Sequence, residues 1–386
     1  MHVLVIPSWF YRYLDDPSGS FFETQASGVQ ELGVQVGIIY PDIRPLYEAA
    51  GHWCTSIEST SRNGVDTLRK RYVNWTPRIE SLILPRWVSV GLRLFDEYCR
   101  RYGKPDIIHA HCLLRAGILA HRIWQKYGIP YVITEHSSKW HNNEISKYDL
   151  QISKSAAQHS SALISVSESL LNKLHKYLDF NQAYIIGNAV DSLFLDEKVQ
   201  EFNNASRLTF ANVAYLNSGK RQDILIEAFY LAFGQDTEHV LYIVGEGPER
   251  ASLERRIAEY DMQSSIQLLG MQKKSEIAKL LSRSDCFVLT SDHETFGVAI
   301  IEALACGLPI ISTDCGGPSE IVNAENGIVV MKGNAQAIME ALLEMQKKIH
   351  VGQYQKKRIR AGCREHYSKR SVASKLINIY KNALHK

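Results

Sequence analysis

The sequence lacks several features that would place the chain in a specialised class of protein. Its seven cysteines are scattered, with no Cys-x-x-Cys and no metal-ligand spacing. That pattern favours reduced thiols in a cytosolic protein over a disulfide framework. The formal net charge of +3 is too small to indicate nucleic acid as a partner.

Membrane-spanning and targeting segments are missing as well. No stretch approaches the roughly 18 consecutive apolar residues that cross a bilayer. The segment Met1–Pro7 has no basic leader, and its apolar run is too short for a signal peptide. We therefore expect a cytoplasmic protein, with peripheral attachment to the inner face of the cell membrane left open.

Two sequence motifs are absent. No Asp-x-Asp occurs, and no His/Asp/Glu cluster has metal-ligand spacing, so neither a metal nor another cofactor is expected. No Gly-x-Gly-x-x-Gly follows the first apolar run, which argues against a dinucleotide-binding dehydrogenase.

What the 386 residues do contain is a regular alternation of short apolar runs with amphipathic helices. It predicts a doubly wound α/β fold, and the length allows two domains, 1–186 and 187–369. The predicted strands are Val3–Ile6, Val34–Tyr40, Ile107–His109, Tyr131–Thr134, Ala162–Val166, Leu208–Val213, Val240–Val244, Ile266–Leu269, Cys286–Leu289 and Ile310–Ser312. The predicted helices include Phe22–Leu32, Ala116–Tyr127, Asp223–Gly234, Arg250–Tyr260, Ser275–Ser282 and Phe296–Ala305.

The segment Asp292–Glu320 carries the most chemical information. Gly297 should open a helix whose free N–H groups and dipole attract an anion such as a diphosphate. Glu294 stands just before this helix, and Glu302 lies roughly 12 Å further along it. A carboxylate at each end can accept hydrogen bonds from hydroxyl groups of a ligand. Together with the following turn Gly316–Pro318, this pattern indicates a nucleotide-sugar site.

This segment resembles the Glu-(seven residues)-Glu signature of the family-4 retaining glycosyltransferases with the GT-B fold, also described as glycosyl transferases group 1. Further matches in the same order are Ile107–His111, Thr134–His136, Val166–Ser169, Gly187–Asp191, Gly245–Pro248, Leu269–Gly270 and Ser284–Leu289. The resemblance implies two Rossmann-like domains facing across a cleft, with the C-terminal helix 370–386 returning to the N-terminal, acceptor-binding domain.

The implied activity is retaining, hexosyl-type and metal-independent transfer of a sugar from a UDP- or GDP-sugar. The acceptor would be a glycan or lipid-linked saccharide in surface polysaccharide or glycoconjugate biosynthesis. By this resemblance Glu294 contacts the donor sugar, and Glu302 binds the ribose. The residues expected to bind the donor are Gly19, Ser20, Lys220, Arg221, Gly247, Glu294, Thr295, Phe296, Gly297, Val298, Glu302, Gly316 and Gly317.

Lys220, His111 and Glu294 are the expected catalytic residues. A lysine just ahead of a helix can pair with the departing diphosphate. The family usually places an arginine five residues earlier, where this chain has Tyr215. Arg221 is one residue that could supply the missing charge.

His111 ends a predicted parallel strand, at the sheet edge where α/β proteins bind ligands. It could hydrogen-bond the sugar and steady charge near the reacting carbon, or it could be a buried structural histidine. His109, on the other face of the strand, fits the structural alternative better. His136 and Glu135, which end the next strand, are predicted acceptor-side contacts.

Two basic regions leave membrane contact open. Thr67–Arg101 interleaves arginines with aromatic residues, which suits either a helix on an anionic bilayer or a crossover helix packed on the sheet. The tail Lys347–Lys386 is helical and basic, with Lys356 in its densest part, and suits a solvated helix face or a contact with anionic lipid.

Two other functions remain open from the sequence. A nucleotide-sugar epimerase or phosphorylase could share the fold. A non-catalytic sugar-nucleotide-binding protein could retain Glu294, Glu302 and Lys220 while departing from the family at Tyr215.

Overall fold

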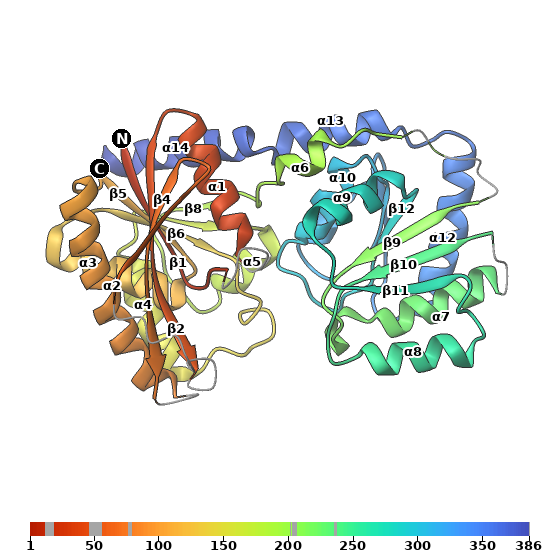
Figure 1. The fold of residues 1–386 in the computed structure, drawn as a ribbon, viewed down its shortest axis with the longest axis horizontal. Coiled ribbons are helices and arrows are strands. Elements are labelled where there is room, and N and C mark those ends of the chain that lie inside the picture. The colour runs from red at the N-terminus through yellow and green to blue at the C-terminus, as the bar shows by residue number, and fades with distance from the viewer. Residues whose placement is uncertain are drawn as a thin grey trace. The chain divides into compact units, whose positions relative to one another are not determined.

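The computed structural model describes residues 1–11, 19–45, 56–75, 79–200, 202, 207–234 and 238–385. The chain forms two compact units, Met1–Ala189 together with Lys369–Lys386, and Val190–Ser368. Each unit is built on a mainly parallel sheet with helices packed against it (Figure 1). The predicted α/β fold with two doubly wound sheets is confirmed.

The first unit contains an eight-stranded sheet of order β3-β4-β2-β1-β5-β6-β7-β8, in which only the β3–β4 pair is antiparallel. Its strands are β1 (His2–Pro7), β2 (Gln35–Pro45), β3 (Glu58–Arg62), β4 (Val65–Asn74), β5 (Ile107–His111), β6 (Tyr131–Glu135), β7 (Ala162–Ser165) and β8 (Ala183–Ile185). Its helices are α1 (Ser20–Glu31), α2 (Glu80–Tyr102), η2 (Leu113–Gly117), α3 (Ile118–Tyr127), α4 (Lys147–Gln158), α5 (Glu168–Leu174) and the C-terminal α14 (Lys369–Leu384).

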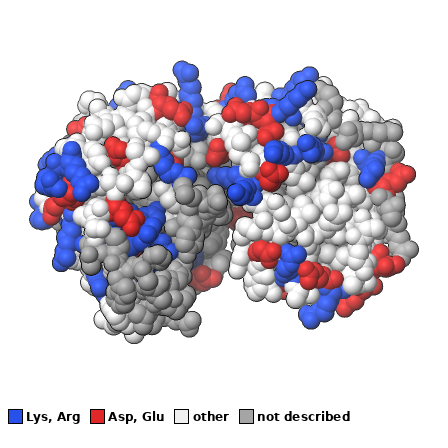
Figure 2. Space-filling view, in the orientation of Figure 1, with Lys and Arg blue, Asp and Glu red and all other residues white. Residues whose placement is uncertain are grey.

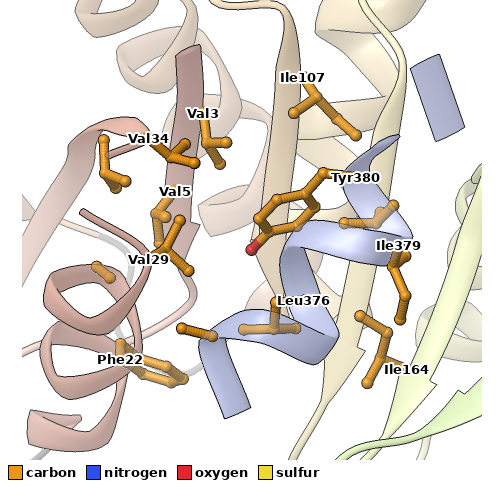
Figure 3. Packing of buried hydrophobic residues seen from close by; sticks show 14 of the residues in the cluster. Val3, Val5, Phe22, Val29, Val34, Ile107, Ile164, Leu376, Ile379 and Tyr380 are labelled. Carbon is orange, nitrogen blue, oxygen red and sulfur yellow. The ribbon is translucent and has the colours of Figure 1, made fainter. Parts of the chain in front are cut away.

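Helix α14 completes the core of the first unit. Its apolar face, with Leu376, Ile379 and Tyr380, packs among side chains of the central strands such as Val3 and Ile107 (Figure 3). It lies beside α1 (Figure 1). The expected return of the C-terminal helix to this domain is confirmed, because burying its apolar stripe requires a partner that α1 and the sheet supply.

The region Thr67–Arg101 does not form one helix. Its first part is strand β4, on which Arg69 is only 6% exposed. The helix α2 begins at Glu80 and buries Trp87 and Phe95 within the unit, packing mainly against β2 and also against β4 and α3. These two aromatic side chains lie where the crossover-helix alternative predicts, whereas Trp75 is 57% exposed. Strand β4 was missed because neither its burial nor its sequence alternates, and a run of charged residues occupies its middle.

The second unit contains a six-stranded parallel sheet of order β11-β10-β9-β12-β13-β14. Its strands are β9 (Thr209–Val213), β10 (Val240–Val244), β11 (Ile266–Gly270), β12 (Cys286–Leu289), β13 (Ile310–Thr313) and β14 (Gly327–Val330). Its helices are α6 (Ser192–Asp196), η3 (Ser218–Lys220), α7 (Gln222–Phe233), α8 (Arg250–Glu259), α9 (Lys274–Arg283), α10 (Val298–Ala305), α11 (Pro318–Ile321), α12 (Ala335–His350) and α13 (Lys356–Tyr367).

One residue of the basic C-terminal region departs from the expected solvated face. Lys356 is 2% exposed, and its Nζ donates to the carbonyl of Ser284 at 2.7 Å and lies 3.7 Å from the Asp285 carboxylate. A buried ammonium needs such partners because desolvation disfavours its charge. On the face drawn in Figure 2, acidic and basic side chains are interspersed on each unit. Among the described residues, no helix combines the length and hydrophobicity needed to cross a membrane.

Candidate active site

The order of strands in the second unit brings two predicted site residues together. The chain reverses direction across the sheet between β9 and β12, and ligands of α/β proteins bind at such switch points beyond the carboxyl ends of the strands. Lys220 follows β9, and Glu294 follows β12. The Lys220 ammonium pairs with Glu294 Oε1, although 74 positions separate the two residues.

Two hydroxyl side chains hold this pair in place. Ser291 Oγ donates to Glu294 Oε1 at 3.0 Å. Thr290 Oγ1 lies within hydrogen-bond distance of the carbonyls of Lys220, at 3.0 Å, and of Arg221, at 3.1 Å. The hydroxyl groups thereby tie the end of β12 to the loop after β9. Sequence reasoning missed both residues, although they fill the short connection between a predicted strand and Glu294.

Glycines shape the loops around Glu294. Gly297, at the start of α10, has φ +91°, a conformation that side-chain-bearing residues rarely adopt. Glu294 N donates to the carbonyl of Cys315 at 2.9 Å, and Gly317 N donates to the carbonyl of Glu294 at 3.1 Å. A Cβ on Gly317 would lie 2.3 Å from the carbonyl oxygen of Thr295. The turn containing Gly316, whose φ is +113°, therefore packs directly on the Glu294 loop.

Helix α10 starts beside this loop. Its first residue is Val298. The N-cap residue is Gly297, which has no side chain that could cap the helix. The preceding Phe296 is buried against Tyr367, with ring centroids 5.7 Å apart, and fixes the entry of the chain into the helix. The helix dipole and unpaired N–H groups at this end attract negative charge.

Glu302 lies about one turn along α10 and is partly buried. Burial raises the pKa of Glu302 to about 7, with Lys274 acting against this rise and Asp191 adding to it. These two neighbours form an ion pair of their own at 3.2 Å. The Glu302 carboxyl therefore titrates near neutral pH, and it is a good acceptor for hydroxyl groups when ionised.

Replacing Glu302 with glutamine should stabilise the protein at about pH 8, by about 1–3 kcal/mol. A carboxyl whose pKa is higher in the folded state opposes folding once it ionises. The wild type should lose stability as the pH rises from 4.5, the ordinary pKa, to about 7. Melting temperatures measured across this range should converge for the two proteins at acidic pH. The exposed Glu259→Gln on α8 is the control; equal effects of both substitutions at high pH would contradict the assignment.

The cationic residue next to Lys220 is already paired. Arg221 Nε lies 3.2 Å from Asp223 Oδ1, and Arg221 Nη1 lies 3.5 Å from Asp292 Oδ1. Tyr215 is 56% exposed. The next residue, Leu216, lies so close to Gly247 that a Cβ on Gly247 would be 2.2 Å from the Leu216 carbonyl oxygen. Gly247 thus shapes the loop, while Lys220 carries the charge that Tyr215 does not provide.

In the first unit, the predicted His111 is 1% exposed and pairs with His136, their Nδ1 and Nε2 atoms 2.9 Å apart. His109 bridges Thr134 Oγ1 and the Tyr380 hydroxyl of α14, each at 2.7 Å. Burial lowers the pKa of His109 and of His136 to about 3, and lowers that of His111 well below its usual range. These imidazoles are neutral near pH 7, so His111 can act on a sugar through a hydrogen bond and not through positive charge.

Glu135 has a local structural task. Its carboxylate is fully buried and accepts hydrogen bonds from the backbone N–H groups of Leu113, His136 and Ser137 at 2.8–2.9 Å. It thereby holds the turn that follows β5, in which Cys112 has φ +74°. These three donors occupy most of the lone-pair positions of the carboxylate. An acceptor-side contact by Glu135 stays a prediction.

The first glycine predicted to bind the donor, Gly19, directly precedes α1. Gly19 has φ +71°, and its carbonyl accepts from Phe22 N at 3.0 Å. Ser20 opens the helix, but its side chain lies outside the described residues, as does Ser18. A positive φ is readily adopted by glycine and rarely by other residues, which is a physical reason for a glycine at this position.

Among the described residues, no group of three or more His, Cys, Asp or Glu side chains is arranged to hold a metal ion. The site assembled on the second unit brings together the Lys220 ammonium, the Glu294 carboxylate, the hydroxyl groups of Thr290 and Ser291, and the N-terminus of α10. Chemically, this set can bind a phosphorylated sugar through charge and hydroxyl contacts.

Solved structures share this architecture over nearly their full length. Sucrose-phosphate synthase from Thermosynechococcus elongatus matches with a TM-score of 0.77 at 18% identity, covering 100% of both chains. Anabaena HepE, solved in complex with UDP, matches with a TM-score of 0.74 at 16% identity, covering 99% of this chain and 100% of that one. The fold is that of the GT-B glycosyltransferases.

Sequence comparison identifies the family. The model described as Glycosyltransferase Family 4 matches residues 19–192, and the model described as Glycosyl transferases group 1 matches residues 195–361. The chain belongs to this family of glycosyltransferases, as its resemblance to the Glu-(seven residues)-Glu signature indicated.

Several curated proteins are similar to the chain. The putative teichuronic acid biosynthesis glycosyltransferase TuaC of Bacillus subtilis is 26% identical over 89% of this chain and 88% of its own length. N-acetyl-alpha-D-glucosaminyl L-malate synthase of Bacillus anthracis is 24% identical over 72% and 75%. An uncharacterised glycosyltransferase of Methanocaldococcus jannaschii is 29% identical over 62% of this chain and 65% of its own length.

Proposed function

We propose that this protein transfers a sugar, with retention of anomeric configuration, from a nucleotide-sugar donor to a glycan or lipid-linked saccharide acceptor. The observation that carries the proposal is the pairing of Lys220 with Glu294 at the strand switch point, beside the N-terminus of α10. A single carboxylate paired with a single ammonium suits a donor that presents both hydroxyl groups and a diphosphate.

In this proposal Lys220 stabilises the leaving diphosphate, together with the N-terminal N–H groups of α10. Glu294 accepts hydrogen bonds from hydroxyl groups of the transferred sugar, and Glu302 accepts them from the ribose. The glycosidic bond to phosphate breaks as the sugar becomes oxocarbenium-like, and the acceptor hydroxyl attacks the same face and passes its proton to the leaving diphosphate. Preorganised charge at the leaving group supplies the largest part of the catalysis.

The comparisons support the class of donor. Anabaena HepE has been solved with UDP and with UDP-glucose, and its fold is shared with this chain. The name of the relative TuaC refers to teichuronic acid biosynthesis. We infer a UDP- or GDP-sugar as donor and a role in polysaccharide or glycoconjugate biosynthesis.

A donor panel followed by a transfer assay tests the function. Among UDP-, GDP- and ADP-sugars, one nucleotide series should raise the melting temperature of the purified protein. With that donor and a saccharide acceptor, NMR should detect a glycosidic product whose anomeric configuration matches the donor. Binding with neither transfer nor hydrolysis would indicate a non-catalytic protein, and an altered donor sugar formed without acceptor would indicate an epimerase.

Transfer should not require a divalent cation. Lys220 and the α10 N-terminus provide the positive charge that a metal supplies to the diphosphate in other enzymes. Initial rates should be equal in excess EDTA and in Mg²⁺. Loss of activity in EDTA that is restored by Mg²⁺ or Mn²⁺ would refute this part of the proposal.

A further inference from the structure

Three arginines surround one buried carboxylate on the first unit, and none of these residues has been assigned a role above. The Asp42 side chain is 3% exposed. Its oxygens lie 2.8 Å from Arg44 Nε, 3.5 Å from Arg71 Nε and 3.7 Å from Arg69 Nη1. Glu58 is a second acid, 3.2 Å from Arg71 Nη1. We refer to these five residues as the Asp42 cluster, in which three guanidinium groups face two carboxylates.

The register of the sheet places the cluster at a ligand-binding edge. Strands β2 and β4 are parallel, with Tyr40 opposite Arg69 and Asp42 opposite Arg71. Because alternate residues of a strand share a face, Asp42, Arg44, Arg69 and Arg71 project from the same side of the sheet. They lie toward the carboxyl ends of both strands, where open α/β sheets bind ligands.

The environment of Arg69 shows that the cluster is a buried, packed arrangement and not a chance contact between surface side chains. Its side chain is 7% exposed, and its guanidinium carbon lies 4.8 Å from the centre of the Tyr11 ring and 5.6 Å from that of Tyr40. Aromatic faces attract a guanidinium and hold it in one orientation. Burying this charge is costly unless anions compensate it.

Arg71 lies at the accessible side of the cluster. Its Nε is buried 3.5 Å from Asp42 and its Nη1 lies 3.2 Å from Glu58, but its side chain as a whole is 34% exposed. An oxyanion that reached the exposed part of this guanidinium would balance the surplus positive charge and could accept charge-assisted hydrogen bonds from it.

We propose that the Asp42 cluster binds an anionic group, a carboxylate or a phosphate, carried by the acceptor. This inference rests on the proposed function, because it places the anion on the substrate that receives the sugar. The binding of an anion at this site does not depend on catalysis and can be measured separately.

Calorimetric titration of the full-length chain tests binding. The parent carries Lys220→Ala, which removes the ammonium proposed to bind phosphate at the donor site. Inorganic phosphate and glucuronate are the two anionic probes, and glucose is the neutral one. Arg71→Gln should weaken binding of the preferred anion by about tenfold, and the better probe distinguishes phosphate from carboxylate. Lys70→Gln, which removes the same charge from the adjacent residue of β4 on its opposite face, should leave the affinity unchanged.

Equal anion affinities for the Arg71→Gln and Lys70→Gln proteins would overturn the inference, as would a parent that binds neither anion. Melting temperatures and an Arg71→Lys variant, which should bind with intermediate affinity, separate loss of the site from loss of the fold.

Transfer kinetics in the Lys220-containing protein separate this inference from the proposed function. Arg71→Gln should raise KM for a uronic acid or phosphorylated acceptor about tenfold more than KM for its neutral counterpart. An unchanged preference alongside normal transfer would refute the anion site and leave the glycosyltransferase function intact. Arg71-dependent anion binding without transfer to any acceptor would support the site and refute the function.

Discussion

Replacing Lys220 with alanine is expected to reduce kcat for sugar transfer by about 100- to 1,000-fold, the usual cost of removing one preorganised group that stabilises developing negative charge. Lys220 is the ammonium that pairs with Glu294 at the strand switch point. Its neighbour Arg221 is held by Asp223 and Asp292, so little positive charge remains for the leaving diphosphate. Initial rates at saturating donor measure the effect.

A matched control for this variant is Lys279→Ala in the same unit. Lys279 is 51% exposed on α9 and pairs with Glu276, an exposed pair of small energetic value. The Lys279→Ala protein should transfer sugar at the rate of the wild type. Near-normal turnover by the Lys220→Ala protein would contradict the central assignment of the donor site, in which Lys220 stabilises the leaving diphosphate.

Replacing Gly317 with alanine is expected to reduce activity by about 100-fold, because displacing a catalytic group by about 1 Å commonly has that cost. A Cβ at this position would lie 2.3 Å from the carbonyl oxygen of Thr295 and 2.7 Å from the Cα of Phe296. Both contacts are to backbone, so the loop that carries Glu294 must move. Overpacking of this kind should also destabilise the protein by about 1–3 kcal/mol.

The control for the glycine variant is Gly362→Ala. Gly362 lies in helix α13, and a Cβ there would meet no atom within 4 Å. Alanine is the better helix former, so this change should stabilise the protein by up to about 1 kcal/mol and leave activity unchanged. Denaturant unfolding and initial rates measured side by side separate the two glycines. Full activity of the Gly317→Ala protein would show that the close packing of the turn on the Glu294 loop does not matter for transfer.

Several elements could be predicted because their signals are local. The buried runs Val240–Val244 and Cys286–Leu289 form strands β10 and β12 with the predicted bounds. Fully apolar stretches of four to five residues between helices have few alternatives in a parallel sheet. The sequence likewise predicted that Gly297 opens a helix, and in the structure it directly precedes the first residue of α10.

Other features could not be read from neighbouring residues. Strand β4 was hidden because Arg69 and its charged neighbours look solvent-exposed in the sequence, although Asp42 and aromatic rings bury Arg69 in the fold. Lys356 was expected on a solvated helix and is instead held by groups more than 70 positions away in the sequence. In each case a distant partner offsets the desolvation of a charge, and such partners are invisible to local pattern.

The sequence by itself determined the family and the type of fold, because the spacing of Glu294, Gly297 and Glu302 is set within a single loop and helix. Only the tertiary structure decided which residues accompany them. In the fold, Lys220 and Ser291 donate hydrogen bonds to Glu294, and Tyr380 of the last helix forms a hydrogen bond with His109, 271 positions earlier. The physical reason is that strand order and helix return are selected by burial of apolar surface over the whole unit, which no short segment encodes.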